Sequence, residues 1–279
     1  MSGALYVVST PIGNLGDITR RAAETLGAAD RIAAEDTRRT RALLSHLGIR
    51  GKPLVTLDAH ASDHTIEDLV TELEKGESIA LVTDAGTPSV SDPGGELVKR
   101  AAARGVTIIA IPGPSAVTAA VSVSGLVEGP FLFLGFLPRK GEKRKRALRR
   151  ISGSIEPVVL FEAPNRIRET LSDLAQVAPA RRACVARELT KLHEELLRGT
   201  LAELAARDVA PRGEFTIVVE GNGDPEAAED GDVDALVEAR LDSGDPPRTI
   251  ADDVSEVTGR PRREVYARVL ELRKRRGDD

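Results

Sequence analysis

The feature that most constrains the fold of this sequence is the regular alternation of short apolar runs with longer helical patterns in its first part. Five apolar runs have the length of buried strands, at residues 5–9, 31–34, 54–57, 79–83 and 106–111. Helical patterns follow at residues 18–26, with Asp17 as the expected N-cap, 37–47, closed by Gly48, 65–74, 96–104 and 116–123. This alternation predicts an open, largely parallel sheet covered by helices.

After residue 125 the pattern changes. Strands are predicted at residues 131–136, 158–161, 183–187 and 215–220, and helices at residues 142–151 and 167–178, whereas residues 194–199 fit either element. The α/β fold therefore comprises a domain over residues 1–113 and a second α/β domain over residues 114–222, with more antiparallel pairing. Residues 223–232 are acidic and predict a linker. Residues 233–279 predict a small helical appendage, whose last two helices have the size of a helix-turn-helix.

Composition limits both the core and the class of partner. Only 3% of the 279 residues are aromatic and none is Trp, so the core must consist of aliphatic side chains, as in buried parallel sheets. The scarcity of aromatic rings also argues against an RNA-binding platform built from stacked aromatic residues, and a net charge of −5 argues against a globally basic protein. The single cysteine, Cys184, is expected in the core. Neither a membrane-spanning run nor a signal-peptide pattern is evident, which favours the cytoplasm.

Four loops that follow strands are rich in Gly, Pro, Ser, Thr and Asp. They comprise residues 9–17, 84–94, 112–115 and 162–166. Ligands of open α/β sheets bind at the carboxyl ends of strands, so three such loops in one domain and a fourth in the next predict a ligand cleft between the domains. None of them has the glycine spacing of a dinucleotide fold or a phosphate-binding P-loop, which disfavours hydride transfer and NTP hydrolysis.

Five motifs along the chain resemble one family. They are Ser9-Thr10-Pro11-Ile12-Gly13-Asn14-Leu15, Ala34-Glu35-Asp36-Thr37-Arg38, the loop 84–94, Ile111-Pro112-Gly113-Pro114-Ser115-Ala116 and Phe161-Glu162-Ala163-Pro164-Asn165-Arg166. In this order they resemble the tetrapyrrole-methylase superfamily and, more narrowly, its 16S rRNA cytidine 2′-O-methyltransferases. Tetrapyrrole-modifying members carry Gly-Asp-Pro where this chain has Gly86-Thr87-Pro88, a difference that favours the ribosomal branch.

The resemblance implies S-adenosylmethionine as cofactor, held between two α/β domains largely by backbone groups of the Gly- and Pro-containing loops. Carried over by position, it places near the cofactor Pro11, Ile12, Gly13, Asp84, Gly86, Thr87, Pro88, Ser89, Val90, Ser115, Ala116, Phe161, Glu162, Ala163, Phe215 and Thr216. It further implies a homodimer that acts on 16S rRNA within the small ribosomal subunit.

Methyl transfer from a sulfonium is an in-line displacement, so the protein must mainly align donor and acceptor. A ribose hydroxyl is a weak nucleophile that a positioned base would assist. Glu35, Asp36 and Glu162 are the candidate bases, and Asn14 and Asn165 the candidate contacts to the nucleoside. A structural interpretation competes equally, because a polar residue after a strand often caps the next helix.

A basic segment between residues 139 and 150 is the candidate RNA contact in an otherwise acidic protein. The residues expected to contact phosphates are Arg139, Lys140, Lys143, Arg144, Lys145 and Arg146, extended by Arg38 and Arg39. The competing interpretation is a solvated helix face. His60 and His64 have a helical i, i+4 spacing, but methyl transfer needs no metal and none is predicted.

Two other functions fit parts of this pattern. A methyltransferase of the same fold could act on a tetrapyrrole or another small molecule, although a small macrocycle would not need the basic segment. A non-catalytic RNA-binding assembly protein could have kept the fold without binding S-adenosylmethionine.

Overall fold

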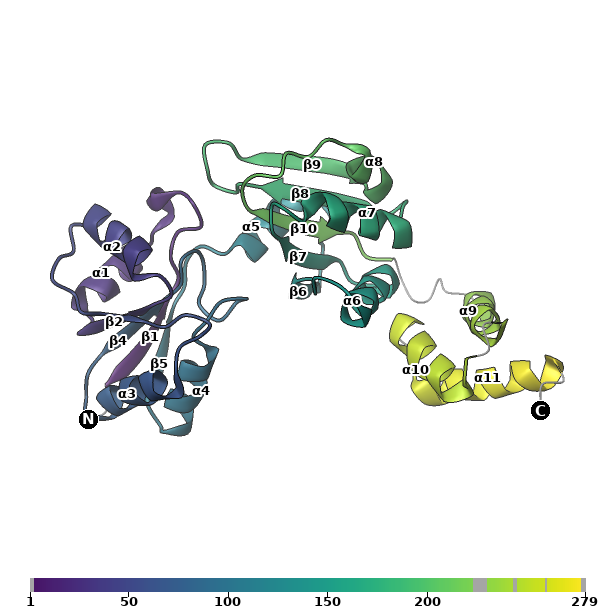
Figure 1. Ribbon diagram of the computed structural model, residues 1–279, viewed down its shortest axis with the longest axis horizontal. Coiled ribbons are helices and arrows are strands. Elements are labelled where there is room, and N and C mark those ends of the chain that lie inside the picture. Colours follow the sequence, from purple (N-terminus) through teal and green to yellow (C-terminus); the bar gives the residue numbers. More distant parts are fainter. Residues whose placement is uncertain (1–2, 223–229, 243–244, 259, 277–279) are drawn as a thin grey trace. The chain divides into compact units, whose positions relative to one another are not determined.

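Five parallel strands form the first sheet of the computed structural model, which describes residues 3–222, 230–242, 245–258 and 260–276 (Figure 1). The strands lie in the order β3-β2-β4-β1-β5. They are β1 (Ala4–Val8), β2 (Arg31–Ala34), β3 (Leu54–Thr56), β4 (Ile79–Val82) and β5 (Thr107–Ile111). They alternate with α1 (Arg20–Ala28), α2 (Thr37–His46), α3 (Asp63–Glu74), α4 (Gly95–Ala103) and α5 (Ala116–Ser124). The predicted alternation is confirmed.

Helices cover both faces of this sheet, as the two-residue period of strand β4 shows. Ile79 and Leu81 pack in one apolar cluster with α3 and α4, whereas Ala80 and Val82 pack in another with α1 and α2. All four side chains are almost fully buried. Burial on both faces explains why the strand is a continuous apolar run in the sequence.

The second sheet is mixed and has the order β6-β7-β10-β8-β9. Its strands are β6 (Leu132–Phe136), β7 (Val158–Glu162), β8 (Arg182–Arg187), β9 (Glu195–Thr200) and β10 (Phe215–Val219). Strand β7 runs parallel to β6 and antiparallel to β10, and β10 runs antiparallel to β8. Helices α6 (Glu142–Gly153), α7 (Ile167–Val177) and α8 (Leu201–Ala206) contribute to one large apolar core with these strands.

Two elements here extend the sequence prediction. The undecided segment 194–199 forms strand β9, because it pairs at the edge of the sheet beside β8. Helix α8 was not predicted, although its start carries a signal: Thr200 and Glu203 form a reciprocal capping box. Cys184 is buried in β8 as expected, and burial raises the pKa of its thiol.

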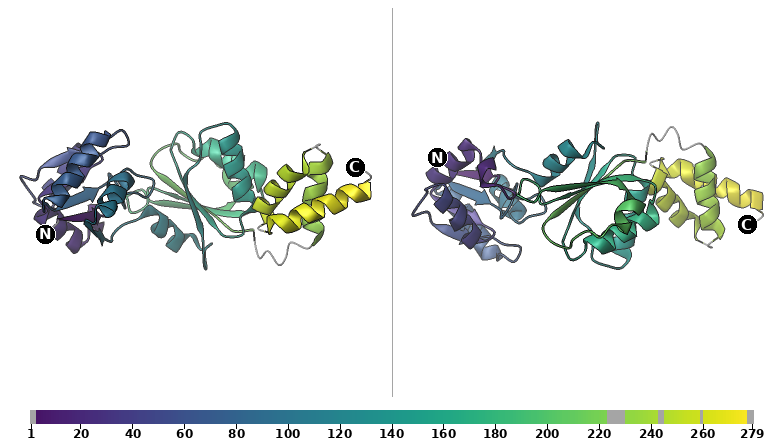
Figure 2. Two further views of the ribbon diagram at one scale, coloured as in Figure 1. Left: turned by 90° about the horizontal axis from the view of Figure 1, so that it is seen from below. Right: turned by 90° about the horizontal axis from the view of Figure 1, so that it is seen from above.

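Three helices form the C-terminal region: α9 (Asp230–Asp242), α10 (Pro247–Thr258) and α11 (Arg262–Arg276). They lie side by side around a small core that includes Val237, Ile250 and Val269 (Figure 2). Of the predicted linker, residues 223–229 lie outside the described residues, and residues 230–232 already belong to α9. Among the described residues, no helix is both long and apolar enough to cross a bilayer.

Contacts divide the chain into two compact units. The first consists of Met1–Ala120 and Glu188–Glu195, and the second of Val121–Arg187 and Leu196–Asp279. The predicted boundaries after residues 113 and 222 remain predictions.

The predicted N-cap of α1 is wrong. Asp17 ends a short 3-10 helix, η1 (Leu15–Asp17), and Thr19 caps α1 by accepting a hydrogen bond from the amide of Ala22 at 3.1 Å. The additional turn displaces the helix start toward the C terminus.

Gly94, at the start of α4, is a position where the backbone conformation of the second loop favours glycine. Its φ is +114°, and a Cβ atom would lie 2.8 Å from Cδ2 of the buried Leu81. We therefore expect Gly94→Ala to lower the free energy of unfolding by about 1–3 kcal/mol. Gly129→Ala is the matched control, because a Cβ there meets nothing within 4 Å, and we expect a change within about 0.5 kcal/mol. Equal unfolding midpoints in urea for the two variants would contradict this account.

Candidate functional site

Three of the four predicted loops come together at the carboxyl edge of the first sheet. Strand β1 lies between β4 and β5, so the loops that follow these strands are neighbours. Thr10 and Gly86 join the first two loops by a reciprocal pair of backbone hydrogen bonds, 2.8 Å from the Thr10 amide and 3.0 Å from the Gly86 amide. The sheet order therefore brings together residues that are far apart in the sequence.

The third loop is attached to the same cluster by side chains. The hydroxyl groups of Ser9 and Thr87 lie 2.9 Å apart, and the Thr87 hydroxyl also lies 3.3 Å from the carbonyl oxygen of Pro114. A Cβ atom on Gly113 would lie 3.0 Å from Cβ of Ser9, so the loops approach closely there. Thr87 is thus the side chain that connects all three loops.

The backbone of the loop 84–94 has a shape that few sequences adopt. Four of its residues have positive φ: Gly86 (+88°), Ser89 (+69°), Ser91 (+66°) and Gly94 (+114°). The two serines are strained there, because a side chain disfavours the left-handed region. Within the described residues, the backbone amides of Thr87 and Ser89 donate to no acceptor. Strained backbone with free donors is typical of a loop that binds a ligand.

The other predicted cofactor residues of this unit differ in exposure. Gly13 and Ser89 are exposed, and Gly13 lies so close to the aliphatic chain of Lys191 that an added Cβ would clash with it. The remaining ones are buried (Pro11, Ile12, Gly86 and Pro88) or half-buried (Asp84, Thr87, Val90, Ser115 and Ala116). Asn14, the candidate nucleoside contact, caps η1 by accepting a hydrogen bond from the amide of Gly16 at 2.9 Å.

Two carboxylates connect the ends of strands β2 and β4. Glu35 accepts hydrogen bonds from the Thr83 hydroxyl at 2.6 Å and from the Asp84 amide at 3.1 Å. In return, Asp84 accepts a hydrogen bond from the amide of Asp36 at 3.0 Å. Each loop thereby holds the backbone of the other, which gives Glu35 a positioning role.

The surroundings of Asp36 and Asp84 shift the pKa values of the two carboxyl groups in opposite directions. Asp36 is the N-cap of α2, and its hydrogen bonds from Arg38 lower the pKa of its carboxyl group. Burial, together with the neighbouring charge of Glu35, raises the pKa of Asp84. Arg39 lies 3.5 Å from Asp84 and partly offsets this effect. Of these two aspartates, Asp84 is the better suited to accept a proton, a role that the sequence motifs did not predict for it.

The predicted cofactor residues of the second unit lie where strand β7 ends and strand β10 begins. Phe215, at the start of β10, pairs with Glu162 at the end of β7, and Thr216 pairs with Phe161. Thr216 and Phe215 are buried, whereas Phe161 and the adjacent Ala163 are half-buried.

Glu162 is fully engaged. Its buried carboxylate accepts hydrogen bonds from the Ala163 amide at 2.8 Å and from the Thr170 hydroxyl at 2.5 Å, and Nε of Arg166 lies 3.3 Å away. With these partners it serves to hold the surrounding loop and is poorly placed to act as a base.

Arg144 does not belong to the RNA-contacting set. It is only 5% exposed, and its guanidinium donates to Asp173 at 2.7 Å, to the Thr170 hydroxyl at 3.0 Å and to the Pro138 carbonyl at 3.1 Å. These bonds hold α6 against α7, so the guanidinium is not available to a phosphate. Nothing in the charge run of the sequence distinguishes this arginine from its neighbours.

The other predicted RNA contacts are exposed. Lys145 forms an ion pair with Glu142 at 2.9 Å, and Arg38 pairs with Asp36 at 2.7 Å. The remaining cations are Arg39, Arg139, Lys140, Lys143 and Arg146. Exposure leaves this set accessible to a polyanion.

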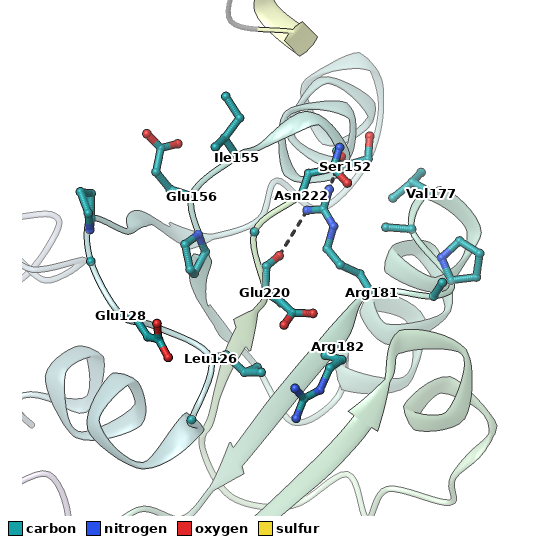
Figure 3. A pocket seen from close by; sticks show the side chains of 18 residues that line it. Leu126, Glu128, Ser152, Ile155, Glu156, Val177, Arg181, Arg182, Glu220 and Asn222 are labelled. Carbon is teal, nitrogen blue, oxygen red and sulfur yellow. Dashed lines mark hydrogen bonds between the residues drawn. The ribbon is translucent and has the colours of Figure 1, made fainter. Parts of the chain in front are cut away.

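A pocket of the second unit lies away from these exposed cations. It has a volume of about 1240 Å³ and lies where β7 and β8 begin and β10 ends (Figure 3). Glu162 lies at the opposite end of these strands. Arg181 lies along the wall of the pocket and donates to the carbonyl groups of Ser152 and Glu220 (Figure 3). It also donates to the carbonyl group of Ile151. None of the predicted site residues lines the pocket.

The histidines form no metal site with other residues of the described chain. The amide of His60 donates to Asp58 at 2.8 Å, and His64 lies 3.5 Å from Asp68 on the exposed surface of α3.

Comparison with known families identifies related sequences along nearly the whole chain. Residues 4–205 match the family described as Tetrapyrrole (Corrin/Porphyrin) Methylases, and residues 227–273 match the RsmI C-terminal HTH domain. The ribosomal RNA small subunit methyltransferase I of Xylella fastidiosa (strain Temecula1) is 47% identical over 272 residues, which cover 95% of this chain and 98% of that protein. The protein of the same name from Bacillus subtilis (strain 168) is 43% identical over 230 residues, covering 82% of this chain and 78% of that protein.

Solved structures share the fold at low sequence identity. The uroporphyrin III C-methyl transferase of Thermus thermophilus aligns with a TM-score of 0.57 at 19% identity and covers 78% of this chain and 97% of that one. Another structure of uroporphyrin-III C-methyl transferase from that organism, in complex with S-adenyl homocysteine, aligns with a TM-score of 0.54 at 18% identity, covering 77% and 97%. A conserved hypothetical protein from Aeropyrum pernix K1 aligns over 99% of this chain and 98% of its own, with a TM-score of 0.60 at 18% identity.

The raised pKa of Asp84 predicts a pH-dependent effect of Asp84→Asn. The asparagine can still accept the Asp36 hydrogen bond but carries no charge beside Glu35. A carboxyl group whose pKa is raised by folding destabilises the fold once it ionises. We therefore expect no stabilisation by Asp84→Asn at low pH and a growing stabilisation as the pH rises through the pKa of Asp84, measured as the thermal unfolding midpoint.

Asp84→Ala is the control for removal of the acceptor. It leaves the Asp36 amide without its partner, so we expect a loss of about 1–3 kcal/mol that persists across the pH range. A stabilisation by Asp84→Asn that is equal at all pH values would contradict the assigned electrostatic cause.

Proposed function

Because this chain belongs to the tetrapyrrole (corrin/porphyrin) methylases, we propose that it transfers a methyl group from S-adenosylmethionine to the 2′-hydroxyl of a cytidine in 16S rRNA. The rRNA substrate is proposed from the names of relatives that match nearly the whole chain, and from the match of its C-terminal region. The cytidine and its 2′-hydroxyl rest on the motif resemblance.

The observation that carries the proposal is the three-loop cluster of the first unit. Positive φ at four positions and free backbone amides at Thr87 and Ser89 within the described chain fit a cofactor held by main-chain groups. In this assignment Gly86–Val90 hold S-adenosylmethionine together with Pro11, Ile12, Gly13 and the helix start at Ser115 and Ala116. Phe161, Glu162, Ala163, Phe215 and Thr216 are the contacts assigned to the second unit.

S-adenosylmethionine supplies a methyl group that is already activated by the sulfonium, so alignment of the hydroxyl is the main task of the protein. Glu35, Asp36 and Glu162 act as positioning residues, because the hydrogen bonds that they accept fix the adjacent loops and helices. Asp84, with its raised pKa, is the carboxylate assigned to accept a hydrogen bond from the ribose hydroxyl. Asn14 and Asn165 are assigned to the nucleoside.

The exposed cations of the basic segment supply the contacts to the RNA backbone. Lys140, Lys143 and Arg146 form no ion pair with an acid among the described residues, so they can neutralise phosphates directly. The proposal also includes a homodimer in the cytoplasm that acts on the assembled small subunit.

Methyl transfer is tested with labelled S-adenosylmethionine and small ribosomal subunits from a strain that lacks this gene. We expect label in the 16S rRNA, which nuclease mapping places on the 2′-oxygen of a cytidine. Subunits from the parent strain, in which the target is already methylated, are the control. Label on a base would contradict the ribose target, and label only in small-molecule extracts would favour the tetrapyrrole alternative. Absence of any heat on titration with S-adenosylmethionine would favour the non-catalytic assembly protein.

The RNA surface is tested by reversing three exposed charges together, Lys140→Glu, Lys143→Glu and Arg146→Glu. We expect weaker binding to small subunits and a shallower dependence of log K on log salt, by about one unit for every phosphate that the variant no longer neutralises. The matched control reverses Arg20, Lys75 and Lys99, which are exposed on other helices or their ends and change the net charge equally. Equal salt slopes for the two triple variants would remove the basic segment from the interface.

A further inference from the structure

A second pocket of the second unit lies at the carboxyl ends of β6 and β7. Its volume is about 700 Å³, which is within the usual range for small-ligand sites. It is lined by Phe136, Leu137, Pro138, Arg139, Ala163, Asn165, Arg166 and Glu169. One wall is therefore the segment that leads into the basic helix α6. The other is the segment between β7 and α7 together with Glu169 in the first turn of α7.

Two guanidinium groups fix the first wall. Arg166 donates to the carbonyl of Leu137 at 2.8 Å, and Arg144 donates to the next carbonyl, that of Pro138, at 3.1 Å. Both arginines are also connected to Glu162, Arg166 directly at 3.3 Å and Arg144 through the hydroxyl of Thr170. A buried polar network of this kind holds a pocket wall in one conformation. The wall of the pocket is thus held by specific hydrogen bonds.

An exposed aromatic ring lines this pocket in a chain that has few aromatic residues. Phe136 is 51% exposed although it lies at the end of a strand, and its ring packs against that of Phe161, with centroids 5.6 Å apart and a tilt of 58°. The Phe161 ring is in turn held edge-on by Phe133 at 5.1 Å. An exposed but supported phenyl ring offers a stacking surface to a planar ligand.

The polar groups of the pocket are available to a ligand. Among the described residues, no hydrogen bond or ion pair engages the side chains of Arg139, Asn165 or Glu169, and all three are exposed. Together they offer a cation, an amide and a carboxylate. A carboxylate would repel a bare phosphate, and the charges disfavour a purely apolar ligand. A planar ring with donors and acceptors on its edge, attached to a phosphate chain, satisfies all three groups.

We propose that this pocket receives a single unstacked nucleobase of the RNA, with cytosine preferred. The base stacks on Phe136, Glu169 accepts a hydrogen bond from its exocyclic amino group, and Asn165 contacts the remaining edge. Arg139 and the adjacent cations hold the flanking phosphates. This inference rests on the proposed RNA substrate and adds to it the residues that recognise the base. One aromatic ring is sufficient for one base, so the low aromatic content does not oppose it.

The test measures binding of matched oligonucleotides that are abasic at every position except a single central nucleotide. The central nucleotide is cytidine, uridine or also abasic, so the phosphate contacts are the same in all three. For the unaltered protein we expect cytidine to strengthen binding about tenfold over the abasic chain. Phe136→Ala is expected to abolish this difference and Phe136→Tyr to retain it. Glu169→Gln is expected to reduce the preference for cytidine over uridine, which lacks the amino group.

Phe131→Ala is the matched control. Phe131 is also an exposed phenylalanine, 37% exposed, but it precedes β6 at the other end of the strand and does not line the pocket. We expect this variant to distinguish cytidine from the abasic chain as the unaltered protein does. An equal loss in Phe131→Ala and Phe136→Ala would overturn the assignment of the base to this pocket.

Two results would separate this inference from the proposed function. Salt-dependent binding of all three oligonucleotides with equal affinity would overturn the base pocket and leave the phosphate-binding surface in place. Binding of S-adenosylmethionine without binding of any oligonucleotide or small subunit would overturn the RNA substrate, and the base pocket with it.

Discussion

The candidate site depends on the backbone hydrogen bonds between Thr10 and Gly86. They join the loops after β1 and β4, two strands that are neighbours in the sheet, although 76 positions separate the two residues in the sequence. Once this pair is formed, the Thr87 hydroxyl lies within reach of both Ser9 and Pro114. The strained conformation at Ser89 and Ser91 therefore belongs to a loop whose ends are held by the sheet.

Carboxylates next to strand ends have a similar function in both units. Glu35 holds the backbone of Asp84 in the first unit, and Glu162 holds Ala163, Thr170 and Arg166 in the second. Glu35, directly after β2, accepts hydrogen bonds from the segment that follows β4. Glu162, at the end of β7, accepts them from the segment that follows β7 and from α7. Such bonds are strong because the acceptor is charged, and little water competes for the buried Glu162. The glutamates are therefore better explained as supports of the site than as its bases.

The basic segment has two physically different parts. Arg144 points inward and fixes the wall that ends β6, whereas its neighbours Lys143 and Arg146 are exposed to solvent. A single helix thus both fixes one wall of the pocket, through Arg144, and carries exposed cations. This arrangement connects the proposed recognition of the base with the proposed contacts to phosphates.

The sequence by itself determined the alternation of strands and helices, because a buried strand must be an apolar run and an amphipathic helix must repeat its apolar positions. It also determined the four loops, since Gly and Pro are needed where the backbone departs from regular conformations. The inward direction of Arg144, the pairing of Glu35 with Asp84 and the strand at residues 195–200 depended on neighbours that are distant in the chain. Only tertiary structure decides such contacts, because charge and burial are properties of the surroundings and not of the residue type.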